Sequence, residues 1–442
     1  MIALYNLFSV IFLLIASPIF LVKKKARYGL AQKLGFVPES VRKTFPRQPR
    51  PVWFHAVSVG EFNALRPLLE AFRINHPEIP VVVSTTTGTG QQLARERVGD
   101  WATVIYFPYD VPWATKNWLN VLKPQLVVIV ETEIWPGFID QCARRLIPLA
   151  VVNGRLSPRS HRFYMRLRAL FGPTLRKIEA IGVQTKEEKE RYISVGAASE
   201  RTIVLGNMKF DGLIAKPEPE VQKLKKALNL DEESLVVVAG STHDSEESAV
   251  LEAFGLLRKH PSFQNRDLRL IIVPRHPERF SIVAELITSR GYHVIRHSRN
   301  EAFSAANDVY LLDVIGKLAT FYGLADAAFV GGTLAPIGGH NILEPYAYSV
   351  PVLCGPHLEK TRDLALQLKA REALYVVNNS EELAEALALL LANRSLNASV
   401  GQRGNELLMS SQGAVGRAMV LLNGILSATG KQTAAVKSLV RT

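Results

Sequence analysis

One glycine-rich stretch of the chain has the composition of a phosphate-binding loop. It follows the apolar run Ala327–Val330, typical of a buried parallel strand, and spans Gly331 to Pro345 with four glycines. Its glycines would let backbone N–H groups approach a ligand, and a helix beginning at Asn341 would add partial positive charge for a phosphate. Glu344 would lie in the first turn, where it can accept hydrogen bonds from ribose hydroxyls. The spacing matches neither a Walker A loop nor Gly-x-Gly-x-x-Gly, so a turn that only allows close packing is the alternative.

A carboxylate stands where a predicted strand gives way to a helix. Glu61 follows the strand-like run 51–59 and a turn at Gly60, and apolar positions then recur at helical spacing through Phe72. Ligand clefts of open α/β sheets lie at the carboxyl ends of the strands, so Glu61 is a candidate site residue. The alternative is a glutamate that only stabilises the positive end of its helix.

Two further acids, Glu131 and Glu133, follow the apolar run 126–130. A pair of acids in this arrangement resembles the metal ligands of some nucleotide-sugar enzymes. Two acids one position apart on an extended segment point in opposite directions, so we predict no metal site here. Hydrogen-bonding and electrostatic roles at the strand end are the preferred interpretation.

Arginines supply two kinds of candidate anion site. Arg275 ends another predicted strand, and its planar guanidinium can bind a phosphate or a carboxylate through two hydrogen bonds. A second group surrounds an apolar, aromatic stretch and suits a phosphorylated, acylated partner at a membrane, with a solvated helix face as the alternative. This group is Arg155, Arg159, Arg162, Arg166 and Arg168.

Strand-like and helix-like segments alternate along both halves of the chain. Apolar runs are followed by polar loops and amphipathic helices, which is typical of doubly wound parallel sheets. We therefore predict an α/β fold of two Rossmann-like domains that face a cleft. The predicted strands are 51–59, 81–84, 103–107, 126–130, 149–152, 180–183 and 202–205 in the first half, and 235–239, 268–273, 310–315, 327–330 and 350–354 in the second.

Length and proline positions divide the chain. At 442 residues it exceeds one ordinary core, and Pro217 and Pro219 mark a boundary between the halves. The predicted parts are a membrane anchor at 1–22, a basic linker or interfacial arm at 23–50, a first domain at 51–210, a second domain at 211–403, a closing helix at 404–428 that crosses back to the first domain, and a tail at 429–442.

The first segment is predicted to anchor the chain in a membrane. Residues 2–22 are almost wholly apolar and uncharged, and about 20 helical residues span the ~30 Å hydrocarbon layer. Basic residues follow directly at 23–25 and at Arg27, and none precedes, which is unlike a cleavable signal peptide and places the rest of the chain in the cytoplasm. An interfacial or re-entrant helix is the alternative, and it also places the chain on a membrane.

The charge distribution agrees with a membrane partner. The formal net charge is +13; residues 1–210 hold 29 Lys and Arg against 15 Asp and Glu, whereas residues 211–442 hold 24 against 25. Basic groups near an anionic surface contribute about 1 kcal/mol each. The sequence has no nucleic-acid-binding pattern, so we predict an acidic lipid-bound partner and no nucleic acid. Cys142 and Cys354 match no metal or redox spacing and fit a reducing compartment.

Six short motifs occur in the order found in one enzyme family. The chain resembles the Kdo (3-deoxy-D-manno-octulosonic acid) transferases of Gram-negative bacteria, which are two-domain glycosyltransferases of the GT-B type and form glycosyltransferase family 30. The resemblance extends from the apolar N-terminal segment to about residue 370. The motifs are Ser58-Val59-Gly60-Glu61, Glu131-Thr132-Glu133-Ile134-Trp135-Pro136, Asn153-Gly154-Arg155-Leu156-Ser157, Gly240-Ser241-Thr242-His243, Val273-Pro274-Arg275-His276 and Gly338-Gly339-His340-Asn341-Ile342-Leu343-Glu344-Pro345.

The resemblance implies a reaction and residue roles. Kdo would pass from CMP-Kdo to the acylated, bisphosphorylated diglucosamine precursor of lipid A, with inversion, release of CMP and no cofactor or metal. Glu61 would be the general base, and Glu131 and Lys209 would stabilise the transition state. CMP would be held by Pro274, Arg275, Ile315, Gly316, Lys317, Asn341, Ile342, Leu343 and Glu344, with Ser241, Thr242, His276 and Arg155 as weaker candidates.

Two positions depart from the family pattern. Lys317 stands where the family usually has Glu, so the backbone there could still bind the nucleotide, but no carboxylate could do so. Asp244-Ser245 replaces the more usual Glu-Gly after the Ser-Thr-His motif, which would stiffen the backbone of that loop. Neither change touches Glu61 or Glu344.

Two other functions are compatible with the same residues. One is a GT-B transferase with a UDP-sugar donor, and the other is a non-catalytic, membrane-tethered protein that binds anionic lipid. The enzyme interpretation places the chain at the inner membrane through its N-terminal segment, with both domains on the cytoplasmic side.

Overall fold

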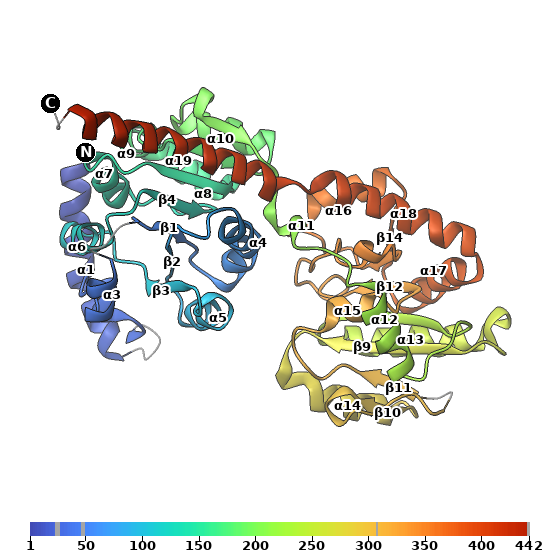
Figure 1. Ribbon diagram of the computed structural model, residues 1–442. Helices are drawn as coiled ribbons and strands as arrows, with labels where there is room; N and C mark the ends of the chain where they lie inside the picture. Colours follow the sequence, from blue (N-terminus) through green and yellow to red (C-terminus); the bar gives the residue numbers. More distant parts are fainter. Residues whose placement is uncertain (23–26, 46–48, 306–307, 440–442) are drawn as a thin grey trace. The chain divides into compact units, whose positions relative to one another are not determined.

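The computed structural model describes residues 1–22, 27–45, 49–305 and 308–439, and the chain divides into two compact units (Figure 1). Unit 1 comprises Met1–Gly212 and Ser411–Thr442, and unit 2 comprises Leu213–Ser410. Each unit is built around one seven-stranded sheet in which every pairing is parallel. The α/β class and the two Rossmann-like domains are therefore confirmed.

The sheet of unit 1 has the order β3-β2-β1-β4-β5-β6-β7. Its winding reverses between β1 and β4, where Val52 is in register with Val81 on one side and with Leu126 on the other. Doubly wound sheets bind ligands at such a switch point, beyond the carboxyl ends of the strands. The strands are β1 Val52–His55, β2 Val81–Thr85, β3 Ala102–Tyr106, β4 Leu126–Val130, β5 Leu149–Gly154, β6 Ala180–Val183 and β7 Thr202–Val204.

Helices cover both faces of this sheet, so successive strand residues are buried on opposite sides. Trp53 packs in one core with Trp118 and Phe138, and its neighbour Phe54 packs in the other with Phe72. The helices of unit 1 are α1 Ile2–Val22, α2 Leu30–Lys33, α3 Glu39–Thr44, α4 Val59–Asn75, α5 Gly88–Val98, α6 Pro112–Leu122, α7 Pro136–Arg144, α8 Pro158–Arg166, α9 Arg168–Leu175, α10 Lys186–Val195, η2 Ser199–Arg201, α11 Met208–Asp211 and α19 Ala414–Leu439.

The segment predicted as a linker or arm belongs to unit 1 in its described part, residues 27–45. Val37, Val41 and Phe45 are buried in the core on the Trp118 side of the sheet. The Trp118 indole N–H donates to the backbone oxygen of Gln32 at 2.8 Å, and the Gln32 side-chain oxygen accepts from the backbone N–H of Tyr106 at 2.8 Å. The basic residues of this segment suggested a linker, although its apolar residues pack it against the domain.

The N-terminal helix α1 lies against α7 by one face and exposes its apolar side chains on the other. The hydroxyl of Tyr5 donates to Asp110 Oδ2 at 2.7 Å, and Asp110 also accepts from the backbone N–H of Gly137 at 2.8 Å. The exposed large apolar side chains of α1 include Leu4, Leu7, Phe8, Ile11, Phe12, Leu14 and Ile15. Within the described ranges, no helix has the length and apolarity of a membrane span.

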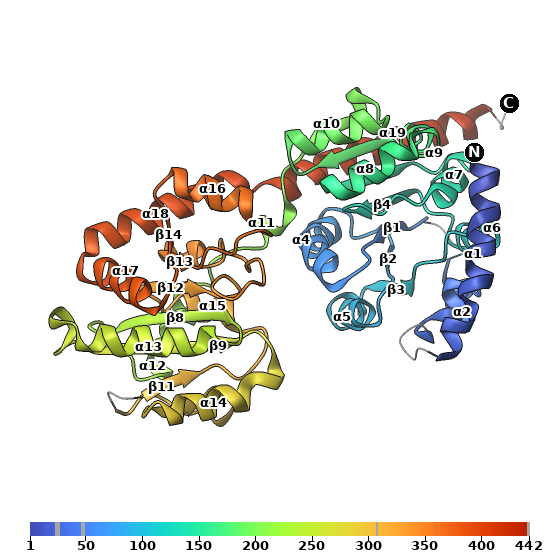
Figure 2. The ribbon, with the colours of Figure 1, turned by 180° about the vertical axis from the view of Figure 1, so that it is seen from behind.

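The predicted closing helix at 404–428 is two helices. The helix α18 spans Arg394–Ser411, Gly413 adopts φ 88°, and α19 then begins at Ala414. The Asp211 carboxylate accepts hydrogen bonds from the backbone N–H groups of Gly413 at 2.8 Å and Ala414 at 3.2 Å. The helix α19 then packs on α4, so the last helix completes unit 1, as both views of the ribbon show (Figures 1 and 2).

The sheet of unit 2 has the order β10-β11-β9-β8-β12-β13-β14, with its switch point between β8 and β12. Its strands are β8 Leu235–Thr242, β9 Leu268–Pro274, β10 His293–Arg296, β11 Asp308–Leu311, β12 Ala327–Val330, β13 Val352–Cys354 and β14 Leu374–Val376. Its helices are α12 Glu218–Ala227, α13 Glu246–Lys259, η3 Pro261–Phe263, η4 Pro277–Arg279, α14 Phe280–Ser289, η5 His297–Arg299, α15 Leu318–Tyr322, η6 Pro345–Tyr348, α16 Arg362–Ala370, α17 Ser380–Ala392 and α18.

Two edge strands of unit 2, β10 and β14, were not predicted, and the strand predicted at 310–315 ends earlier, at Leu311. The reason for the early end is a side-chain contact. Asp313 binds Arg296 Nε at 2.8 Å and accepts from the Ser298 backbone N–H at 2.8 Å, which turns the chain away from the sheet. The apolar run continues past the strand because Leu312 is still buried.

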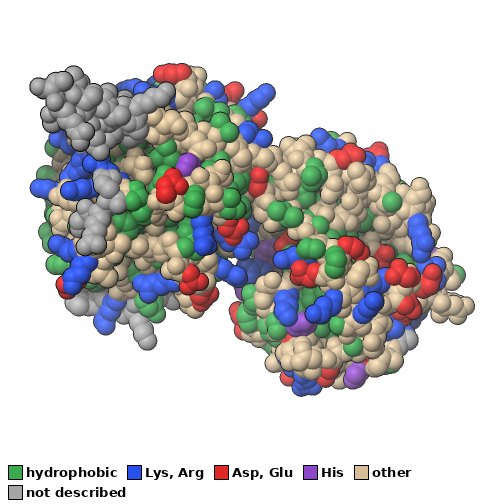
Figure 3. All heavy atoms as spheres, viewed as in Figure 1, with side chains coloured by type: hydrophobic (Ala, Val, Ile, Leu, Met, Phe, Trp, Pro, Cys, Tyr) green, Lys and Arg blue, Asp and Glu red, His purple; other side chains and the backbone are tan. Residues whose placement is uncertain are grey.

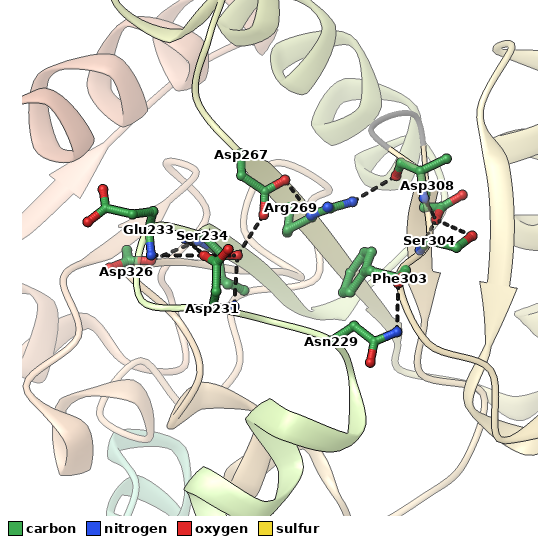
Figure 4. Close-up of polar contacts among 12 residues, drawn as sticks. Asn229, Asp231, Glu233, Ser234, Asp267, Arg269, Phe303, Ser304, Asp308 and Asp326 are labelled. Carbon is green, nitrogen blue, oxygen red and sulfur yellow. Dashed lines mark hydrogen bonds and ion pairs between the residues drawn. The ribbon is translucent and has the colours of Figure 1, made fainter.

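A polar network at the amino ends of the unit 2 strands centres on Arg269 (Figure 4). Arg269 Nε lies 2.7 Å from Asp267 Oδ1, and its Nη1 donates to the backbone oxygen of Ala305 at 2.7 Å. The guanidinium also stacks over the ring of Phe303, 5.0 Å from its centroid. Asp267 Oδ2 accepts from the Ser234 hydroxyl at 2.6 Å. The network ties the starts of β8 and β9 to the loop before β11.

Replacing Arg269 by Met should lower the free energy of unfolding by about 1–3 kcal/mol, because Asp267 and the Ala305 carbonyl lose a largely buried partner. Chemical denaturation of the purified protein measures this change. Arg299→Met is the matched control: Arg299 is mostly exposed and 3.9 Å from Glu301, so its replacement should change stability by no more than about 0.5 kcal/mol. Equal effects of the two substitutions would contradict a stabilising network.

Candidate active site

Glu61 is fixed at the carboxyl edge of the unit 1 sheet by the start of α4. Ser58 caps the helix, and its hydroxyl oxygen accepts from the Glu61 backbone N–H at 3.4 Å. In return the Glu61 carboxylate accepts from the backbone N–H of Val57 at 2.7 Å and from the Ser58 hydroxyl at 3.3 Å. This reciprocal arrangement resembles a capping box, which holds the carboxylate in one orientation beyond β1. The helix-stabilising role and the site role are therefore compatible.

Glu131 and Lys209 form an ion pair at the same sheet edge. Glu131 directly follows β4, the neighbour of β1 across the switch point, and Lys209 Nζ donates to Glu131 Oε1 at 2.8 Å. The Glu131 side chain is 15% exposed and that of Lys209 42%, so the pair borders solvent. It can therefore be reached by a ligand.

The ion pair depends on a buried asparagine that sequence reasoning left out. Asn153, at the end of β5, is fully buried with φ 54°, and its side-chain oxygen accepts from the backbone N–H of Met208 at 3.0 Å. Met208 begins α11, and Lys209 is the next residue. Asparagine tolerates the left-handed conformation better than most residues, so the Asn153-Gly154 step at a strand end was the available signal.

Three charged groups act on one another around Glu61. Burial raises the pKa of Glu61 above its ordinary value, and the hydrogen bond from Val57 opposes this rise. Glu131 raises the pKa of Glu61 further, whereas Lys209 lowers it. The structure thus brings together the three residues predicted to be catalytic. A carboxyl group with a raised pKa is suited to accept a proton near neutral pH.

Glu133 interacts electrostatically with these residues. The prediction that Glu131 and Glu133 point in opposite directions assumed an extended segment. Glu131 has φ 62°, so the segment turns and is not extended. Burial, followed by the charges of Glu61 and Glu131, raises the pKa of Glu133 to about 7, and the Trp135 side chain opposes the rise. Glu133 is therefore electrostatically coupled to Glu61 and Glu131. In the parts of the chain that the structure describes, no set of three or more His, Cys, Asp and Glu side chains is arranged to hold a metal ion.

Arg155 contacts the Glu131–Glu133 turn through its backbone. The Thr132 hydroxyl donates to the backbone oxygen of Arg155 at 2.5 Å, while the Arg155 side chain is exposed. The helix α8 follows, and none of its residues is buried. Phe163 is 52% exposed, so the arginine-rich stretch presents both apolar and basic groups to its surroundings.

The glycine loop of unit 2 folds around a buried carboxylate, which was not predicted. Glu246 begins α13 and is fully buried, and its two oxygens accept five backbone N–H hydrogen bonds. The donors are the N–H groups of His243, Gly332, Thr333, Leu334 and Ala335, at 2.9, 2.7, 2.9, 2.9 and 3.1 Å. The prediction that this part of the loop turns its N–H groups toward a ligand is wrong, because an internal carboxylate already occupies them.

The helix predicted to begin at Asn341 is also absent. Only the four-residue 3₁₀ helix η6 follows the loop. The side chains of Ile342 and Leu343 are fully buried, so any contact they make with a ligand would come from their backbone. Asn341 is exposed, and burial raises the pKa of Glu344 to about 6.

The ends of β8 and β9 bring several weaker candidates together. The backbone N–H of Arg275 donates to the backbone oxygen of Thr242 at 2.9 Å. The side chains of Arg275 and His276 are exposed, whereas Pro274 and Thr242 are buried. Ser241 adopts φ 56°. The guanidinium of Arg275 is therefore available at the switch point of unit 2.

The residues 315–317 form an exposed turn before α15. Gly316 has φ 87°, and a Cβ atom added at this glycine would meet no atom of the described residues within 4 Å. Lys317 Nζ donates to His297 Nε2 at 2.9 Å. Burial and the nearby Lys317 both lower the pKa of His297. The unusual lysine thus has a local partner, and the backbone of the turn stays exposed.

Two parallel, doubly wound α/β units in one chain define a GT-B-like fold. Solved structures agree at the level of fold: a putative UDP-N-acetylglucosamine 2-epimerase from Listeria monocytogenes matches 85% of this chain and 96% of its own, with a TM-score of 0.57 and 15% identity. The C-terminal CMP-Kdo binding domain of an Acinetobacter baumannii protein matches 43% of this chain and 96% of its own, with 30% identity and a TM-score of 0.40.

Sequence comparisons give the family. The family model described as 3-deoxy-D-manno-octulosonic-acid transferase matches residues 28–212. The 3-deoxy-D-manno-octulosonic acid transferase of Haemophilus influenzae is 32% identical over 96% of this chain and 99% of its own length. That of Chlamydia trachomatis is 30% identical over 92% and 94%. The chain belongs to the Kdo transferase family.

Glu133→Gln should stabilise the protein more at pH 8 than at pH 5. The folded-state pKa of Glu133, about 7, lies above that of an unfolded glutamate, so wild-type stability falls as pH rises through this interval. The difference in free energy of unfolding between Glu133→Gln and the wild type should therefore be larger at pH 8 than at pH 5 by roughly 2 kcal/mol.

Chemical denaturation at the two pH values measures this difference. Glu190→Gln, at an exposed position of α10, is the control and should show the same stability relative to wild type at both. A Glu133→Gln variant whose advantage does not grow with pH would contradict the raised pKa of Glu133 in the folded protein.

Proposed function

We propose that the chain transfers Kdo from CMP-Kdo to the acylated diglucosamine bisphosphate precursor of lipid A and releases CMP. The observation that carries this proposal is the arrangement of Glu61 beside the Glu131–Lys209 ion pair at one sheet edge. A base with a raised pKa next to a carboxylate and an ammonium group supplies what a single displacement at a sugar carbon needs.

In the proposed reaction Glu61 takes the proton of the acceptor hydroxyl, whose oxygen forms the new bond to the anomeric carbon of Kdo. The bond from that carbon to the CMP phosphate oxygen breaks, and its electron pair leaves with CMP. Glu131 stabilises positive charge on the sugar ring, and Lys209 stabilises the negative charge that develops on the leaving phosphate. The anomeric centre is inverted, because no protein nucleophile intervenes. We propose that no metal takes part.

Unit 2 is proposed to hold the CMP part of the donor. The exposed guanidinium of Arg275 is suited to the phosphate, and the carboxyl group of Glu344 to the ribose hydroxyls. The exposed turn at 315–317 offers backbone groups to the nucleotide, and Lys317 keeps its own contact with His297.

Glu61→Gln should lower the rate of Kdo transfer by about 10²–10⁴-fold with the fold retained, because the amide cannot take the acceptor proton. The assay mixes the detergent-solubilised protein with freshly generated CMP-Kdo and lipid A precursor, with EDTA present, and follows the lipid mass. Glu70→Gln is the control on the same helix, since Glu70 is 60% exposed and its ion pair is with Arg66, and it should keep wild-type activity.

The outcomes of that assay separate the alternatives. A mass gain of one or more Kdo units with EDTA present supports donor, acceptor and metal independence together. No product from folded wild-type protein would overturn the proposal and favour a UDP-sugar donor or a required metal. A fully active Glu61→Gln variant would remove Glu61 from the role of base.

We propose further that α1 attaches the chain to the inner membrane, with both units on the cytoplasmic side. Its apolar side chains lie on the face turned away from the domain, and unit 1 carries the positive charge of the chain. In Figure 3 the margin of unit 1 along which α1 runs in Figure 1 carries apolar side chains (green) beside Lys and Arg (blue). Such a face suits an anionic lipid surface.

Replacing Phe8, Phe12 and Ile15 by Ser should abolish most binding to vesicles that contain anionic lipid. Each apolar side chain removed from water contributes about 1.5–3 kcal/mol, so three together should weaken binding by at least about a thousandfold. Sedimentation of protein with vesicles measures the bound fraction. The control variant replaces three exposed apolar residues elsewhere with Ser, namely Ile74, Leu146 and Ile214. Equal loss in both variants would contradict a specific role of α1.

A further inference from the structure

Two histidines of unit 2 share a short hydrogen bond at the switch point of the sheet. His243 follows β8 and His340 lies in the glycine loop after β12, and their Nε2 atoms are 2.7 Å apart. The rings are nearly parallel, with an interplanar angle of 6° and centroids 5.0 Å apart. The ring of His276, after β9, meets that of His243 edge to face at 5.2 Å. Three strand ends therefore contribute to one imidazole cluster.

The pair is built into the loop and is not an accidental surface contact. His243 is 9% exposed, and its backbone N–H is one of the five held by Glu246. Gly332 adopts φ 69° directly beside His340, where a Cβ would come within 2.8 Å of the His340 ring. A larger residue at position 332 would push the rings apart. Glycine is therefore needed there for the pair to form.

The chemistry of two imidazoles joined through Nε2 limits their charge. When both rings are neutral, one donates an N–H and the other accepts it through a lone pair. One additional proton can be held on an outer Nδ1 without breaking this bond. A second would set two N–H groups against each other at 2.7 Å. The pair is therefore a unit that gains or loses one proton.

The surroundings of the pair disfavour that additional proton. Burial, then His243, Arg275 and Lys360, lower the pKa of His340 to about 4. The pKa of His243 is lowered as well, by burial and by cationic neighbours, although Glu246 opposes this.

The remaining charges nearby are already paired. Arg279 binds Asp244 at 2.9 Å and Glu247 at 3.0 Å, while Glu359 lies beside Gly338 and 3.6 Å from His357. Arg275 and Lys360 are exposed, so their positive charges can be met by a bound anion. An anion placed between them would offset the repulsion by which Arg275 and Lys360 lower the pKa of His340.

We propose that the His243–His340 pair is a proton-accepting site for the phosphate of the nucleotide, and that it takes up one proton from solvent when this phosphate binds beside Arg275 and Lys360. The inference deepens the proposed function and rests on it. In transfer, the phosphodiester of the donor carries one negative charge, and the broken bond leaves its electron pair on the phosphate of CMP as a second. The proton gained by the pair offsets that additional charge.

Calorimetric titration of the full chain with CMP tests this assignment. At pH 8 CMP is largely a dianion, because its second pKa is near 6. Titration in buffers of different ionisation enthalpy gives the number of protons taken up, which we expect to be greater than zero and at most one per CMP. The affinity for CMP should accordingly fall by up to about tenfold for each unit of pH above 7. Cytidine, which lacks the phosphate, should bind without proton uptake.

Two variants and a control make the result specific. His340→Gln and His243→Gln should each remove most of the proton uptake and flatten the pH dependence of CMP binding. His260→Gln, at an exposed position of the same unit, should behave as wild type. Thermal unfolding of each variant establishes that it is folded, and the two substitutions check each other if one fails to fold.

The possible results distinguish failure of the histidine role from failure of the proposed function. CMP binding without proton uptake by wild type, or unchanged uptake in both folded variants, would overturn the role of the pair and leave the proposed function standing. No CMP binding at all would overturn both, because the donor nucleotide itself would then be wrong. Equal uptake with cytidine would show that the proton is linked to the nucleoside and not to the phosphate, and would also overturn the proposal.

Discussion

The parallel direction of every strand is the constraint on which both candidate sites depend. In each unit it brings all strand carboxyl ends to one sheet edge, and the reversal of winding separates the loops after the two central strands. Glu61 and Glu131 follow the two strands at this point in unit 1, and His243 and Gly331 follow the corresponding pair in unit 2. Residues 70 to 90 positions apart therefore become neighbours without any direct sequence signal.

Buried polar side chains convert this general geometry into specific sites. Asn153 fixes the start of α11 and with it Lys209, and Glu246 holds five backbone N–H groups of its own unit. A buried carboxylate without such partners would cost several kcal/mol, so its hydrogen bonds strongly favour one loop conformation. The loop N–H groups that the glycines were predicted to offer to a phosphate are thus already bonded, whereas the side chain of Arg275 remains exposed.

Both sites contain protonatable groups close enough to influence one another. In unit 1 burial raises the pKa of Glu61 and that of Glu133, and the negative charge of Glu131 adds to both shifts. In unit 2 two imidazoles share one hydrogen bond among cations. In the proposed transfer the first kind of group would accept the proton of the acceptor, and the second would offset the charge added to the leaving phosphate.

The sequence by itself determined the fold class and most strands, and it marked Glu61 and Glu131 as strand-end acids, because apolar runs and strand-end polar residues are local signals. Lys209 was predicted only from the resemblance to the Kdo transferases. The sequence did not reveal the short edge strands β10 and β14. It also did not reveal that residues 27–45 pack on unit 1, because their basic side chains suggested a linker and three core residues among them were not recognised. Only the tertiary structure decided that Glu133 approaches Glu61, that Glu246 fills the glycine loop and that His243 meets His340. Each of these depends on a left-handed backbone residue or on a contact between distant strand ends, and neither follows from residue spacing alone.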